Sequence, residues 1–101
     1  MNPFMQTFRE ILREEGLKLT VVAEHGTCDP AYLHRLYWGE KANPSAQTCE
    51  QIGYAVAAAK GLDYDAMVGV TNELLEAAGF QPLHVQRRRR RPGEGAPGRR
   101  S

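Results

Sequence analysis

The chain is poor in the features that mark membrane, secreted and disulfide-bonded proteins. It has 101 residues and only two cysteines, Cys28 and Cys49, which is too few for the disulfide framework of a small secreted domain. Its apolar runs fall far short of the roughly 20 residues that cross a bilayer. The segment "MNPFMQTFRE" lacks the basic start and the apolar run of a signal peptide. We therefore expect a cytoplasmic protein with buried, reduced thiols and no membrane association.

Signatures of catalysis and metal binding are also missing. Cys28, His25 and His34 do not fall at the CxxC or HExxH spacings that hold zinc. The sequence contains no recognisable Ser/His/Asp set and no glycine-rich phosphate loop. These absences predict a protein without a cofactor, a metal site or an enzymatic activity.

Charge is divided between the two ends of the chain. Through Gln86 there are six basic and eleven acidic residues, a net charge of −5, whereas the remainder has seven arginines against one glutamate, a net charge of +6. The second part contains almost nothing apolar to bury, and such a composition is typical of disorder. We expect residues 1–85 to form one domain and residues 86–101 to form a disordered, arginine-rich tail that suits a polyanionic partner.

Apolar residues recur at helical spacing up to about Phe80, and no segment alternates at period two. N-cap residues and terminating glycines bracket three expected helices, from Asn2 to Gly16, from Ser45 to Gly61 and from Asp63 to Gly79. Two shorter helices, about 19–25 and 30–38, fall between them. The apolar stripe expected to face the core in the last helix consists of Tyr64, Met67, Val68, Thr71, Leu75 and Ala78. The pattern predicts a compact all-α domain of five helices.

The two short helices are separated by the turn "HGTC", a spacing that indicates a helix-turn-helix. The segment "GLKLTVVAEHGTCDPAYLHRLYWGE", residues 16–40, resembles without a gap the phage-repressor or Xre-type helix-turn-helix family, whose typical pattern is G-L-T-Q-E-E-L-A-E-R-A-G-V-S-x-x-Y-I-S-R-L-E-R-G-E. The later segment "NPSAQTCEQIGYAVAAAKGLDYDAM" is similar to the fourth helix of that family and the start of its fifth. The resemblance covers about 80 of the 101 residues and implies a lambda repressor-like domain with its helix-turn-helix at about 19–38.

Three positions depart from the family pattern. Lys18 replaces the threonine that caps the first helix of the motif, so this helix is expected to begin as late as Thr20. Leu19 replaces a glutamine that often contacts a phosphate. Thr27 replaces the turn glycine, and because a β-branched residue resists positive φ, we expect the preceding Gly26 to absorb the bend.

The resemblance implies a sequence-specific regulator of transcription, with repression as the expected mode, that places residues 30–38 in the major groove of double-stranded DNA. The base-contacting positions of the family fall on Pro30, Ala31, His34 and Arg35. Arg35 has the fork that reads guanine, while Pro30 and Ala31 are small enough to approach thymine methyls.

Contacts to the DNA backbone are expected from a second set of residues: Tyr32, Trp38, Lys41, Asn43 and Ser45. Each position also has an ordinary structural interpretation. Tyr32 and Trp38 would then cover the edge of the core, and Lys41 and Asn43 would be loop residues exposed to water. Among the base-contact positions, Arg35 would pair with a carboxylate and His34 would be an ordinary surface residue.

The tail supplies the cations that the acidic domain lacks. We expect Arg87, Arg88, Arg89, Arg90 and Arg91 to lie along the phosphate backbone or to enter a minor groove. Alternatively, the tail is solvated or binds an acidic protein.

Two further features of the family shape the expected partners. Family members usually bind two half-sites as dimers, which implies a homodimer. The outward Val70 and the segment 80–85 are candidate dimer surfaces, and equally candidates for closing the core. Small domains of this fold also act as antitoxins or protein-binding adaptors, so a protein interface with weak DNA affinity is the alternative function. A DNA-binding chain would be nucleoid-associated while bound.

Overall fold

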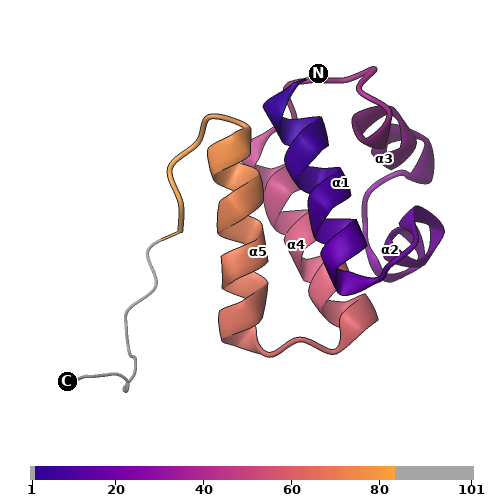
Figure 1. Cartoon of the computed structure of the whole chain (residues 1–101), viewed down its shortest axis with the longest axis vertical. Coiled ribbons are helices and arrows are strands. Elements are labelled where there is room, and N and C mark those ends of the chain that lie inside the picture. Colours follow the sequence, from indigo (N-terminus) through magenta and orange to yellow (C-terminus); the bar gives the residue numbers. More distant parts are fainter. Residues whose placement is uncertain (1, 84–101) are drawn as a thin grey trace.

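The structure, a computed structural model, describes residues 2–83, and all regular secondary structure in that range is helical (Figure 1). The helices are α1 (Pro3–Glu15), α2 (Leu19–His25), α3 (Pro30–Tyr37), α4 (Ala46–Lys60) and α5 (Tyr64–Ala77). For these residues the all-α expectation is confirmed. None of the described helices is long and apolar enough to cross a membrane. The predicted tail, including Arg87 to Arg91, lies outside the described residues.

The helices begin where the capping residues predict. The Asn2 side chain accepts a hydrogen bond from the Met5 N–H at 2.7 Å, and the Asp63 side chain accepts one from the Ala66 N–H at 2.8 Å. Each bond satisfies a backbone donor that has no partner within the first turn of its helix. The termini of α1 and α5 are therefore consequences of local sequence.

The bounds of α2 match the predicted range of about 19–25, and the later start expected from Lys18 is not seen. The helix begins at Leu19, not at Thr20, although Lys18 provides no side-chain cap. The Lys18 carbonyl accepts hydrogen bonds from the Val21 and Val22 N–H groups at 3.0 and 3.2 Å. These backbone bonds form the first turn without help from a side chain.

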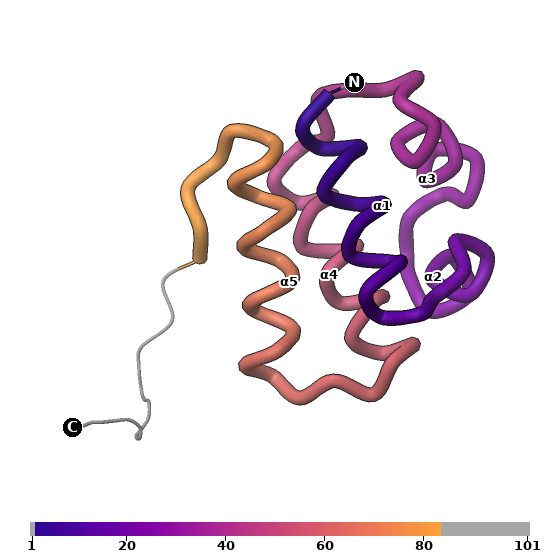
Figure 2. Tube along the Cα trace, viewed as in Figure 1, coloured from indigo at the N-terminus to yellow at the C-terminus, as the bar shows by residue number. Residues whose placement is uncertain are grey.

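The core lies between α4, α5 and α1, while α2 and α3 cover one side of the group (Figures 1 and 2). Its largest fully buried side chains are Phe4, Phe8, Val22, Leu33, Leu36, Ile52, Val56, Leu74 and Leu75. Because every helix contributes to this one cluster, the position of α3 depends on packing throughout the fold.

The buried face of α5 corrects the predicted stripe. Tyr64 is 67% exposed, whereas Val70, expected to face outward, and Leu74, which flanks the predicted stripe, belong to the core. The helix packs against both α1 and α4, so its buried face is wider than one stripe. Val70 therefore closes the core and is not a free dimer surface. Leu83 lies beside α5, where its N–H donates to the Asn72 side chain at 2.7 Å.

The turn between α2 and α3 is accommodated differently from the prediction. Gly26 has φ −114° and ψ 175°, an extended conformation that any residue adopts. A Cβ at this position would instead lie 2.9 Å from the Cβ of Ala55 in α4. Glycine is thus required at position 26 because the turn passes close to α4, and not because the backbone needs a positive φ there.

The two cysteines are free thiols in different surroundings. Cys49 is buried in the core, as expected, and its Sγ donates to the Leu74 carbonyl at 3.7 Å. Cys28 is only half-buried, contrary to the prediction, and donates to the Gln51 side chain at 3.3 Å. Burial raises the pKa of the Cys28 thiol, and burial with the neighbouring Glu50 carboxylate raises the pKa of Cys49 to about 11. Both thiols are therefore protonated at neutral pH.

Candidate nucleic-acid interface

Helix α3 is held at both ends by local structure. At its start the Asp29 side chain accepts a hydrogen bond from the Ala31 N–H at 3.3 Å, and Pro30 occupies the first helical position. At its end the helix stops at Tyr37, one residue earlier than predicted, and Gly39 turns the chain with φ +82°. This positive φ favours glycine, and a Cβ here would also meet the Met5 sulfur of α1 at 2.6 Å.

The two faces of α3 divide as the sequence predicts. Leu33 and Leu36 are 1% and 0% exposed and anchor the helix to the core. The predicted base-contact residues are all exposed, and their spacing places them on one side of the helix. They are Pro30, Ala31, His34 and Arg35.

The loop from α3 to α4 carries the predicted backbone contacts. Lys41, Asn43 and Ser45 are exposed, while Pro44 between them is buried and fixes the loop against the domain. The Ser45 Oγ accepts a hydrogen bond from the Thr48 N–H at 3.1 Å and so caps α4. This loop therefore presents one cation and two small polar groups beside the end of α3.

The two aromatic side chains expected to contact the DNA backbone, Tyr32 and Trp38, have different environments. Tyr32 is half-buried and packs against the core, which favours its structural interpretation. Trp38 is 53% exposed and does not belong to the core. About half of the Trp38 surface is therefore accessible to a partner, while its ring packs edge to face against Tyr37.

An arginine that sequence reasoning missed joins this surface from α1. The Arg9 guanidinium carbon lies 5.1 Å from the centre of the Tyr37 ring and 5.2 Å from that of Trp38. Those two rings meet edge to face with their centres 5.1 Å apart, and the Trp38 ring lies 6.1 Å from that of His34. No local pattern predicts the two contacts of Arg9, because each joins residues more than 25 positions apart.

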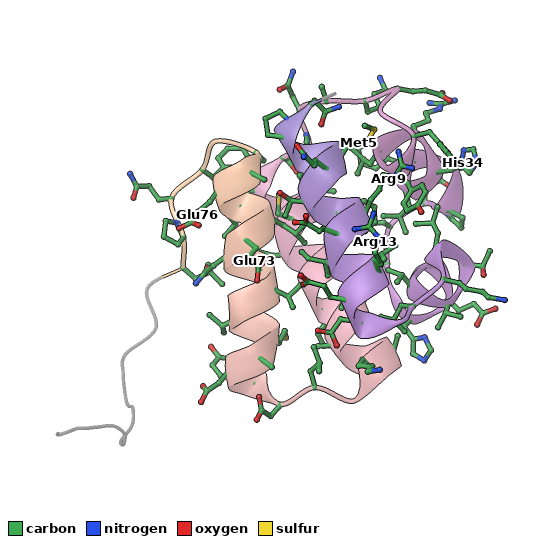
Figure 3. The ribbon with its side chains drawn as sticks, in the orientation of Figure 1. Met5, Arg9, Arg13, His34, Glu73 and Glu76 are labelled. Atoms are coloured by element: carbon green, nitrogen blue, oxygen red, sulfur yellow. The ribbon has the colours of Figure 1, made fainter. Side chains whose placement is uncertain are left out.

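Negative charge gathers on another part of the domain, between α1 and α5. Partial burial raises the pKa of Glu73, and so does repulsion from neighbouring carboxylates. Those carboxylates are Glu14, Glu10, Glu76 and Glu15. Figure 3 shows Glu73 and Glu76 on α5, on the opposite side of the molecule from His34 of α3. These carboxylates make the α1/α5 side unfavourable for a polyanion.

In the range 2–83 no group of three or more His, Cys, Asp or Glu side chains is placed to hold a metal ion. Comparison with known proteins finds no matching family model, no matching curated protein and no matching solved structure.

Proposed function

We propose that this chain is a sequence-specific regulator that binds double-stranded DNA and reads the major groove with α3. The observation that carries the proposal is the division of α3 into a buried face and an exposed face that combines small, polar and forked cationic side chains. The order of the helices supports a lambda repressor-like arrangement, with α2 and α3 as the helix-turn-helix. In this fold the N-terminal half of the second helix meets base edges.

The exposed residues of α3 suit this role chemically. The Arg35 guanidinium can donate two parallel hydrogen bonds to guanine O6 and N7, and the Ala31 methyl can pack against a thymine methyl. Lys41, Asn43 and Ser45 would contact phosphates beside them, which sets the register of the helix without reading sequence. Repression would follow if the bound protein covers a promoter.

A selection of binding sites from random duplexes tests the proposal. The full chain is expected to enrich a defined sequence, and a palindromic site would support binding as a dimer. If no sequence is enriched at low salt, the DNA-binding function is wrong. The acidic domain, with its net charge of −5 through Gln86, and the exposed Trp38 would then favour a protein-binding adaptor.

Arg35→Ala is expected to weaken binding to the selected duplex by about 1–3 kcal/mol and to relax the base preference at one position. The loss arises because alanine cannot replace the two hydrogen bonds to guanine. Fluorescence anisotropy with the selected duplex and its single-base variants measures both effects. Arg13→Ala, which removes an exposed arginine of α1, is the charge-matched control and should keep the full base preference.

Removal of residues 87–101 is expected to weaken binding to every duplex and to flatten the dependence of log K on log salt. Seven arginines are lost, and each phosphate contact contributes about 0.9 to that slope. A salt titration of both chains, on selected and scrambled duplexes, measures the change. An unchanged affinity and slope would show that the tail does not bind DNA.

A further inference from the structure

We infer that Arg9 binds a phosphate of the DNA backbone at the C-terminal end of α3, and that Tyr37 and Trp38 position its guanidinium for that contact. The inference rests on the proposed function and adds to it a residue from α1, outside the helix-turn-helix. It is carried by the arrangement of the three side chains, which joins two helices that are distant in sequence.

The Arg9 side chain is held from several sides. Its guanidinium lies in the angle between the Tyr37 and Trp38 rings, which are inclined at 81° to each other. The Met5 sulfur lies 4.0 Å from one of its nitrogens. Phe8 precedes Arg9 in the chain, and its ring packs edge to face against that of Tyr37, with the ring centres 6.0 Å apart. The guanidinium is therefore fixed relative to the core as well as to the end of α3.

Contact with aromatic rings leaves a guanidinium able to bind an anion. The rings attract the cation through their faces, whereas the N–H donors point outward in the plane of the guanidinium and match two oxygens of a phosphate. Within residues 2–83 the one hydrogen-bond partner of Arg9 is the weakly accepting Met5 sulfur. A side chain held in this way loses little conformational freedom when it binds.

The position of the cluster points to DNA and not to another anion. Trp38 joins Arg9 to His34, one of the predicted base-contact residues, so the surface is continuous from α3 to α1. Figure 3 shows Arg9 on the side of α1 nearest α3, away from Glu73 and Glu76. A duplex with α3 in its major groove has backbone phosphates along the edge of that groove, where Arg9 would meet one.

The first test is a salt titration with the full chain and the duplex selected above. Arg9→Gln is expected to weaken binding about tenfold, as a charged hydrogen bond implies, and to lower the slope of log K against log salt by about 0.9. The base preference should not change, because a phosphate carries no sequence information. Arg9→Lys keeps the charge and should keep the slope. The control Arg13→Gln, one turn further along α1, should change neither.

The second test separates contact from stability. Replacing single phosphates of the duplex by uncharged methylphosphonates should reveal one position whose neutralisation weakens binding by the wild-type chain but not by Arg9→Gln. Trp38 is the one tryptophan of the chain, so its fluorescence should change on binding in the same titration. A merely structural role for Arg9 would lower the thermal midpoint without such a position.

The outcomes distinguish the inference from the function on which it rests. If the chain selects a duplex but Arg9→Gln keeps the wild-type slope and every methylphosphonate acts equally on both proteins, the phosphate contact is wrong and the proposed function stands. If the chain selects no duplex at all, both are wrong.

Discussion

Replacing Gly53 by alanine is expected to destabilise the domain by about 3 kcal/mol, the upper end of the usual range for overpacking. Gly53 is buried in the middle of α4, where α4 crosses α5. An added Cβ would lie 3.0 Å from the Cβ of Thr71 and 3.1 Å from its Cα, and closer still to its hydroxyl. Because a backbone atom is involved and Thr71 is only 3% exposed, no side-chain rotation relieves the overlap. The two helices must move apart.

Gly69 in α5 provides a matched control for this substitution. A Cβ there would meet nothing within 4 Å, so Gly69→Ala should stabilise the protein by roughly 0.5–1 kcal/mol through helix propensity alone. Urea denaturation followed by circular dichroism measures both changes. Thr71→Ala should recover part of the loss in the Gly53→Ala background, and additive effects of these two substitutions would contradict the proposed overlap.

Replacing Phe8 by alanine is expected to cost about 3–5 kcal/mol, because it leaves a cavity in the centre of the core. The Phe8 ring is fully buried, and its centre lies 5.8 Å from the centre of the Phe4 ring and 6.0 Å from that of the Tyr37 ring. Small domains have total stabilities of roughly 5–15 kcal/mol, so the variant should be partly unfolded at 37 °C. Thermal unfolding in the presence of urea gives the free-energy difference.

The control for Phe8 is Phe80, which is 39% exposed beyond the end of α5. Phe80→Ala removes the same ring from a position with solvent on one side, and should cost less than about 1 kcal/mol. Equal losses at the two positions would show that ring burial does not explain the effect. Phe8→Leu, which refills much of the cavity, should recover most of the stability.

Phe8 also connects stability to the candidate interface. Its contact with Tyr37 places the end of α3 against α1, and Tyr37 in turn contacts Arg9 and Trp38. At a temperature where Phe8→Leu is folded, its DNA affinity therefore reports whether small movements of α1 disturb the interface. The proposed phosphate contact of Arg9 would be the first to weaken.

Much of this architecture follows from local sequence. The caps at Asn2, Ser45 and Asp63 and the proline at position 30 act within one helical turn, so the starts of four helices are predictable from a few residues. The period of the apolar residues similarly identifies the buried side of α3 at Leu33 and Leu36. The same period predicts only that the opposite side is exposed; which of its positions are expected to contact bases is implied by the resemblance to the helix-turn-helix family.

The errors at α5 and at Gly26 have a common physical cause, which is that they concern contacts between helices. The width of the buried face of α5 depends on packing against two neighbours, and this decided that Val70 is buried and Tyr64 exposed. Similarly, Gly26 serves an approach to Ala55 in α4, a residue that no pattern around the turn can identify.

The sequence alone determined which segments are helical, where most of them begin and which side of α3 meets solvent, because these properties depend on interactions across a few residues. Only the tertiary structure decided that Trp38 is exposed and that Arg9 of α1 lies against it beside α3. Those features arise from the packing of α1 on α3, which brings together side chains that are far apart along the chain.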